Sequence, residues 1–240
     1  MARKHSGRAV RGSQYHLQNL INEYPTKYLS NLILSNSPSL SAYATESPEW
    51  RSPLACQNFY EYRDGDFLQA VGLSHLRSSL SILWPRFGPS WDALATVAGE
   101  KGVHGVILLE AKSHFKELGN PAYACGAKGE SLENIKASLA IVKHALGVSE
   151  DSDWLGKYYQ YANRLAHLLW LNEEGVPTWM VFLYFIGDLE QRGPNTDVEW
   201  RHKLNEMRIE LGLPEYHPLS DRIVNVFVPV PQKVGHHQIN

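Results

Sequence analysis

The sequence predicts an α/β protein with a mixed central sheet of about four to five strands, flanked by helices and preceded by a helical extension. Two observations carry this prediction. Apolar runs of strand length, at 106–109 and 177–185, alternate with amphipathic segments in the second half of the chain. The run at 106–109 is also uninterrupted by polar residues, which is typical of a strand buried on both faces.

The bulk composition limits the classes of protein to consider. The chain has 240 residues and a net charge of −2, so no general affinity for nucleic acid is expected, although a local basic patch is compatible with it. Two cysteines, Cys56 and Cys125, have no metal-ligand spacing and suit a reducing compartment. No apolar run reaches the length of a membrane span. We therefore expect a cytoplasmic protein without a membrane partner.

The chain divides into three predicted parts: a basic arm with a helical extension at 1–54, the main domain at 55–230 and a tail at 231–240. The first thirteen residues contain only basic charges, from Arg3, Lys4, Arg8 and Arg11. Such an arm is either a solvated tail or a contact for phosphates. Pro25 separates two short helical patterns, and the Ser- and Pro-rich stretch at 36–53 is predicted to be a long loop.

Two consecutive strands with a tight turn between them predict a β-hairpin in the main domain. The first strand covers 91–97, the turn 99–102, and the second strand begins near residue 106. Pairing about a turn near residue 101 places Asp92 opposite roughly residues 109–111. Helical patterns at 67–71 and 73–83 precede this hairpin.

The second half of the chain adds two long helices, a strand, a helix and a last strand. The first helix should stop at Gly147, because glycine readily ends a helix. The second helix carries an unusual polar stripe of amides, one Arg and one His, which fits the lining of a cleft. The predicted elements are helices at 132–146, 154–171 and 198–211, a buried strand at 177–185 and an edge strand at 222–228.

Glu110 and Lys112 end the buried strand of the hairpin. Side chains two residues apart on a strand share a face, so this acid and this base lie side by side. Buried charges need a partner or a metal. The pair is therefore either a structural ion pair or part of an active site, in which Glu110 holds a divalent cation and Lys112 faces a substrate phosphate. Asp92 on the paired strand favours the active site.

These residues bear a family resemblance. Asp92 on one hairpin strand, followed by Glu110-Ala111-Lys112 on the next, resembles the PD-(D/E)XK, or restriction-endonuclease-like, nuclease superfamily. Trp91 stands where that motif usually has proline, although Pro89 lies nearby. The chain is also similar to uncharacterised bacterial proteins of this superfamily at 91–94, 109–112 and 159–165, and the likeness spans roughly residues 55–230.

The resemblance implies a restriction-endonuclease-like fold and a metal-dependent nuclease that hydrolyses phosphodiester bonds, with DNA as the preferred substrate. Asp92, Glu110 and the carbonyl of Ala111 would hold Mg²⁺ or Mn²⁺, since these ions take oxygen ligands. Lys112 would orient the attacking water or stabilise the developing charge. Gln160 would complete the catalytic set.

Further site residues follow from the same resemblance. An upstream acid often joins the metal ligands, and Glu61 is preferred over Asp64 and Asp66 because it lies among aromatic residues. The substrate would be contacted by Asn163, Arg164 and His114. Arg164 suits a bidentate grip on phosphate. His114 is expected on the same strand face as Lys112.

Two other functions stay open at this point. The chain could be a non-catalytic nucleic-acid-binding or structural module on the same fold. It could also be a hydrolase of another class that uses Asp92 and Glu110 as an acid/base pair, although Lys112 would tie up one of those carboxylates. If the protein cuts both strands of a duplex, a homodimer is expected, because one site cuts one strand.

Overall fold

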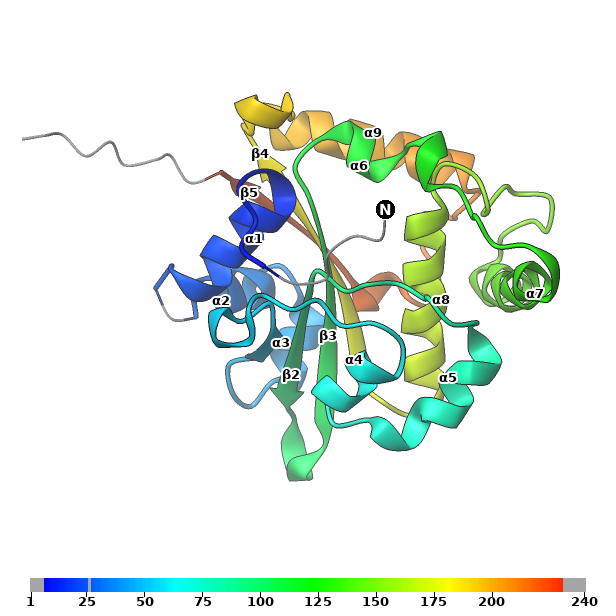
Figure 1. The fold of residues 1–240 in the computed structure, drawn as a ribbon, viewed down its shortest axis with the longest axis horizontal. Coiled ribbons are helices and arrows are strands. Elements are labelled where there is room, and N and C mark those ends of the chain that lie inside the picture. Colours follow the sequence, from blue (N-terminus) through cyan, green and yellow to red (C-terminus); the bar gives the residue numbers. More distant parts are fainter. Residues whose placement is uncertain (1–6, 26, 231–240) are drawn as a thin grey trace, which may run out of the picture.

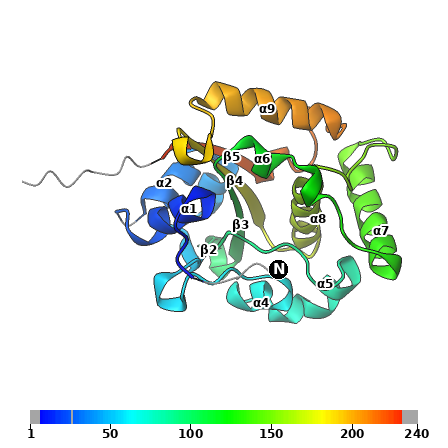
Figure 2. The ribbon, with the colours of Figure 1, turned by 45° about the horizontal axis from the view of Figure 1, so that its top comes forward.

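A computed structural model describes residues 7–25 and 27–230 of the chain, and Figure 1 shows their arrangement. Arg3 and Lys4 of the basic arm, and the predicted tail at 231–240, lie outside the described residues. The described chain forms one central sheet with helices on both faces (Figures 1 and 2). The predicted α/β class is therefore confirmed.

The sheet has five strands in the order β1-β2-β3-β4-β5 within the described part of the chain. The first three strands pair antiparallel, and β3–β4 and β4–β5 pair parallel. The mixed sheet and the edge position of the last strand were both predicted. The strands are β1 (Glu49–Ser52), β2 (Ala93–Ala98), β3 (His104–Lys112), β4 (Thr178–Ile186) and β5 (Ile223–Pro229).

Helices cover both faces of this sheet. The face with the N-terminal helices carries α1 (Gly12–Asn22), α2 (Tyr28–Ser35) and α3 (Pro38–Tyr43). The other helices are α4 (Asp64–Ala70), α5 (Arg77–Leu83), α6 (Phe115–Leu118), α7 (Gly129–Leu146), α8 (Tyr159–Glu173) and α9 (Asp197–Glu210). They pack on the opposite face or along its margin, with α8 lying against β4 (Figure 2).

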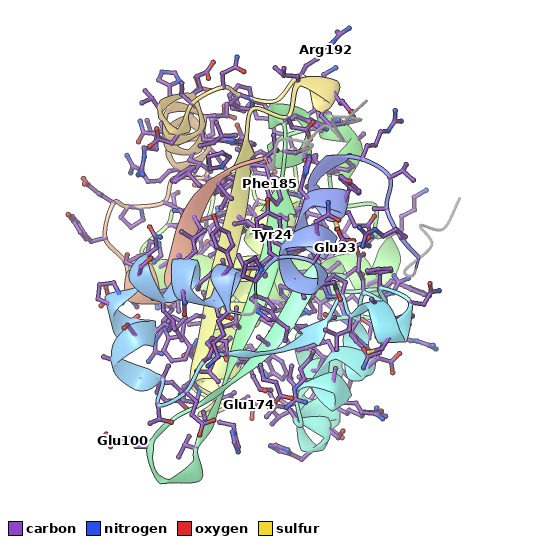
Figure 3. All side chains as sticks on the ribbon, turned by 90° about the vertical axis from the view of Figure 1, so that its left-hand side faces the viewer. Glu23, Tyr24, Glu100, Glu174, Phe185 and Arg192 are labelled. Carbon is purple, nitrogen blue, oxygen red and sulfur yellow. The ribbon has the colours of Figure 1, made fainter. Side chains whose placement is uncertain are left out.

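The N-terminal helices and the sheet enclose the smaller of two clusters of buried apolar residues. Leu17, Leu29 and Ile33 are fully buried against alternate residues of the sheet strands. Figure 3 shows this side of the molecule and labels Phe185 of β4, which belongs to this cluster, and Tyr24 after α1, which packs against the cluster. The extension is thus one layer of the same fold.

The prediction of a long loop at 36–53 is wrong. This stretch contains α3, which Ser37 caps by accepting a hydrogen bond from the Leu40 amide, and the edge strand β1. A helix of six residues and a strand of four are too short to produce a visible period in the sequence.

A glycine sets the end of one long helix, and a tertiary contact precedes the start of the next. The first long helix, α7, ends where predicted, with Gly147 at φ +71° as its cap. The second, α8, begins at Tyr159, later than the predicted start at residue 154. Trp154 is buried before the helix begins, and its indole N–H donates to the carbonyl of Leu211 at 2.9 Å. An aromatic anchor was therefore mistaken for the first turn of a helix.

Alternation along the hairpin decides which face of the sheet carries its polar ends. Ile107 and Leu109 pack under the N-terminal helices, whereas Val106 and Leu108 face α8. Glu110 and Lys112 continue the second series, so they also face α8. On β2, Leu94 faces α8, and Asp92, two residues earlier, lies on the same face of the sheet.

Candidate active site at the open end of the β2–β3 hairpin

Asp92 and Glu110 lie opposite each other where β2 begins and β3 ends. The last pair of the ladder at this end is Ala93 with Leu109, and one further step of the same register would place Asp92 opposite Glu110. The amide of Ala111 donates to Oδ2 of Asp92 at 2.8 Å, which fixes the carboxylate at the strand end. The convergence predicted from the position of the turn is therefore confirmed.

Glu110 is a buried carboxylate held between two cations. Its Oε1 lies 2.5 Å from Nζ of Lys112, and its Oε2 accepts from Nη2 and Nε of Arg164 at 2.6 and 3.1 Å. Burial alone would raise the pKa of Glu110, but Arg164 and Lys112 outweigh it and lower that pKa to about 2. Glu110 is therefore ionised at neutral pH.

Helix α8 supplies the groups that complete this network. Oε1 of Gln160 accepts a hydrogen bond from Nζ of Lys112 at 3.1 Å, so the lysine joins the strand to the helix. The stripe of polar residues along α8 thus meets the end of β3, as a cleft-lining stripe should. His167, lower on the same helix, is buried and binds the carbonyl of Asn163 through Nδ1 at 2.8 Å. Burial lowers its pKa to about 4, which makes it a neutral packing residue.

Arg164 has a structural setting that differs from a phosphate grip. Besides Glu110, its guanidinium donates to Oδ1 of Asn163 at 2.7 Å and to the carbonyl of Ser90 at 3.1 Å, and it lies over the ring of Trp91. The side chain is 6% exposed. These contacts favour a positioning role for Arg164, since they hold the Glu110 carboxylate in place. Asn163, also buried, supports the guanidinium.

Asp92 and Glu61 make the site acidic. The pKa of Asp92 is raised well above its ordinary value, first by burial and then by the charges of Glu110 and Glu61. Glu61 is 8% exposed and accepts from Nε2 of Gln14 at 2.5 Å. Of the three upstream acids, the structure thus brings Glu61 to Asp92.

The other two upstream acids have different surroundings. Asp64 accepts hydrogen bonds from the amides of Phe87 and Gly88 at 3.1 and 2.9 Å. Asp66 is exposed in the first turn of α4, where acidic side chains are favourable. Neither lines the cavities described next.

Two adjoining cavities open at this end of the sheet. The first, here called the acidic cavity, has a volume of about 250 Å³. It is lined by Glu61, Asp92, Glu110, Ala111, Lys112 and Gln160, together with Arg11, Gly12, Ser13, Gln14, Glu117, Tyr123 and Gln191. The second, of about 200 Å³, shares Glu61, Asp92, Glu110, Tyr123 and Gln160 with the first. The predicted catalytic and metal-binding residues therefore line a common space.

The acidic cavity is lined by oxygen-bearing side chains, which are the type of ligand that a hard divalent cation binds. Four carboxylates line it, from Glu61, Asp92, Glu110 and Glu117, and the raised pKa of Asp92 reflects burial and then negative charge that a cation would offset. Both oxygens of Glu110 already accept hydrogen bonds, so this residue would have to share one with a metal ion. In residues 7–25 and 27–230, no group of three or more His, Cys, Asp or Glu side chains is arranged as a metal site.

His114 is not placed where the sequence predicted. Strand β3 ends at Lys112, and the chain turns into α6, so the alternation that would carry His114 to the same face stops. Within the described chain, His114 lines neither of the two cavities. Its amide faces Oε2 of Glu117 at 3.4 Å, at the start of α6.

Several lining residues have no counterpart in the sequence prediction. Ser13 and Gln14 come from the first turn of α1, and Ser13 donates to Oε1 of Glu117 at 2.9 Å. Glu117 could have been noticed as an acid three residues into a helix, where it bonds to the preceding amides. Arg11 lies exposed at the rim. Arg8 is instead part of the fold, because it pairs with Glu23.

Across the described residues, no helix combines the length and the apolar character that crossing a membrane requires. Comparisons with protein-family models, with curated proteins and with solved structures found no match to this chain.

Proposed function

We propose that the protein is a metal-dependent nuclease of the PD-(D/E)XK type, which hydrolyses phosphodiester bonds with DNA as the preferred substrate. The observation that carries the proposal is the meeting of Asp92, Glu110 and Lys112 on one face of the hairpin end, beside a cavity that Glu61 and Gln160 also line. Two acids and a lysine at such a strand end match the needs of this chemistry, which builds negative charge on the phosphorus oxygens.

Metal binding and positioning would fall to different residues of the site. Asp92, Glu110 and Glu61 would hold Mg²⁺ or Mn²⁺, with the carbonyl of Ala111 as a further ligand. A bound ion of this kind polarises a phosphoryl oxygen and lowers the pKa of a water molecule. Arg164 positions Glu110, because it bonds to the Oε2 oxygen from α8.

Lys112 would act on the reacting phosphate. Its ammonium group is held at the cavity by Glu110 and by Gln160, 2.5 and 3.1 Å away. When water adds to phosphorus and the bond to the leaving oxygen breaks, negative charge grows on the phosphoryl oxygens, and an ammonium group at this position stabilises it. Gln160 gives the lysine a second acceptor besides Glu110.

A second function is favoured by one observation. Glu110 has a charged partner on each oxygen, which is the pattern of a structural ion network. A module that binds nucleic acid without cutting it would keep this network unchanged. The hydrolase with an acid/base pair is disfavoured, because Lys112 and Arg164 occupy both oxygens of Glu110, the ionised carboxylate that would have to act as the base.

The two functions separate in a cleavage screen with purified full-length protein. Single- and double-stranded DNA and RNA are incubated with Mg²⁺, Mn²⁺ or EDTA, and products are resolved on gels. We expect metal-dependent cleavage that falls at least a hundredfold in Lys112→Ala and in Asp92→Ala. Lys116→Ala is the matched control, since Lys116 is exposed and lines neither cavity. Binding without cleavage by the wild type would favour the non-catalytic module.

A further inference from the structure

The second cavity has a different character from the acidic cavity that it adjoins. Its wall is rich in aromatic side chains, and polar groups from α8 and from the loop before β2 accompany them. We call it the aromatic cavity. The aromatic members are Trp84, Phe87, Tyr123 and Tyr159, and the polar members that the acidic cavity lacks are Ser90, Asn163 and Arg164. Flat apolar surfaces beside hydrogen-bonding groups suit a heteroaromatic ring.

Phe87 is the least expected residue of this wall. It is 76% exposed, although phenylalanine is normally buried, and its backbone has φ +70°, where residues with a side chain are strained. The Asp64 carboxylate holds this conformation by accepting from the amides of Phe87 and Gly88. Glycine would suit the backbone better and would expose no ring. The stability of the loop therefore does not explain a phenylalanine here.

Two arginines flank the same ring. The guanidinium carbon of Arg63 lies 5.5 Å from the centre of the Phe87 ring, and that of Arg86 lies 5.9 Å from it. An exposed aromatic ring with cationic groups beside it is the arrangement by which proteins bind unpaired strands, because the ring stacks on a base and the cations meet phosphates. Because the overall charge of the chain is −2, a general excess of basic residues does not explain this local concentration of positive charge.

Resting on the nuclease function proposed above, we propose that the aromatic cavity binds one unpaired base of a single-stranded nucleic acid, next to the phosphate that is cut in the acidic cavity. The two cavities share Asp92, Glu110 and Gln160, so neighbouring parts of one nucleotide chain can occupy both. Each volume is below that of common ligand pockets, roughly 300 Å³ or more, which suits a single nucleotide portion. A paired base could not enter, because its faces are covered by the duplex stack.

The test combines a protein change with a substrate change. Affinity is measured by fluorescence anisotropy in EDTA, which prevents cleavage, with short single-stranded DNA and RNA oligonucleotides and the matching duplexes. A series of oligonucleotides carries one abasic site at each position in turn. We expect the wild type to prefer single strands, and Phe87→Ala to bind them roughly tenfold more weakly. Removing the base at one position should weaken binding by the wild type by a similar factor. It should weaken binding by Phe87→Ala little, because both changes remove the same stacking contact.

Three further variants separate stacking from folding. Phe87→Trp keeps a ring and should retain single-strand affinity, and Tyr216→Ala removes another exposed aromatic residue, 81% exposed, which lines neither cavity. Phe87→Gly should melt no lower than the wild type while binding as weakly as Phe87→Ala, because glycine accepts the positive φ.

The outcomes distinguish this inference from the nuclease function. The base site would be overturned if the wild type and Phe87→Ala bound equally well, or if Phe87→Ala lost the same affinity for single strands and for duplexes. Either result would count even if metal-dependent cleavage is found. Single-strand binding that depends on Phe87 in a protein that never cleaves would support the base site and overturn the nuclease. A wild type that binds neither DNA nor RNA would overturn both.

Discussion

At the end of β3, one carboxylate is shared by a lysine of its own strand and an arginine of α8. The two cations differ in surroundings. Arg164 donates to three different acceptors and lies over Trp91. Among the described residues, Lys112 bonds at a cavity wall to Glu110 and Gln160 alone. We infer that Arg164 maintains the structure of the site and that Lys112 is left for chemistry.

This division predicts unequal costs of removing the two charges. Arg164→Met should lower the free energy of unfolding by about 3 kcal/mol, because Glu110 and the Ser90 carbonyl lose a buried donor. Lys112→Met should cost about 1 kcal/mol, since Glu110 keeps Arg164 and water can reach the cavity. Urea unfolding of both variants measures the difference. If the Lys112 variant lost as much as the Arg164 variant, the pair of Glu110 and Lys112 would be a structural ion pair.

Asp92 gives a prediction about pH. Burial, with the charges of Glu110 and Glu61, raises its pKa in the folded protein, so folding takes up a proton above about pH 4, the usual carboxyl value. The metal-free protein should therefore lose stability as pH rises from that value toward the folded pKa. Asp92→Asn removes this loss, and its melting temperature should exceed that of the wild type at pH 8, with a smaller difference near pH 4.

Divalent ions should reverse the order of the two melting temperatures at pH 8. If Asp92 is a metal ligand, as proposed above, Mg²⁺ binds its ionised form and should raise the melting temperature of the wild type while leaving Asp92→Asn nearly unchanged. Melting curves at pH 8 with EDTA or with Mg²⁺ measure both effects. If Asp92→Asn melted below the wild type in EDTA at pH 8, the ionised form of Asp92 would be stabilising, contrary to this prediction.

At the scale of elements, α1 has two roles. Its apolar face covers the sheet through Leu17 and Leu20, and its first turn reaches the acidic cavity, where Gln14 bonds to Glu61. The helix thus links the folding of the N-terminal layer to the position of a candidate metal ligand.

Leu17→Ala tests the first of these roles. The side chain is fully buried, so the change should lower the free energy of unfolding by about 3 kcal/mol, through lost burial and the cavity that remains. Leu189→Ala, at a position that is 76% exposed, is the matched control and should cost less than about 0.5 kcal/mol. Denaturant unfolding gives both values. A negligible loss for Leu17→Ala would mean that the N-terminal layer contributes little to the core.

The elements that could be predicted from the sequence are those with a local signal. The glycine-containing turn set the hairpin register and so the meeting of Asp92 with Glu110, and Gly147 marked the end of α7. Strand β1 has only four residues and lies at a sheet edge, so it carried no usable pattern.

The missing parts of the site depend on contacts between distant segments. Gln14 reaches Glu61 across 47 positions, and Ser13 reaches Glu117 across 104. Nothing near these residues in the sequence signals such a contact. Phe87 was equally hidden, because its exposure and positive φ are properties of the folded loop alone.

For the molecule as a whole, the near balance of charge limits how it can hold nucleic acid. Three arginines, at positions 11, 63 and 86, lie on or beside the two cavities. If these supply the phosphate contacts, the logarithm of the affinity for single strands should fall with the logarithm of salt concentration with a slope of about −2. Anisotropy titrations at several salt concentrations measure the slope. A much steeper dependence would point to basic groups beyond these three.

The central position of β3 has a consequence for the order in which the protein opens. This strand pairs with β2 on one side and β4 on the other, and helices cover both of its faces. Its amides should exchange with solvent only when the whole sheet separates. Glu110 and Lys112 are therefore anchored in the most persistent segment of the fold. The ring of Phe87 sits on an exposed loop, where local fluctuations can admit or release a ligand without disturbing the acids.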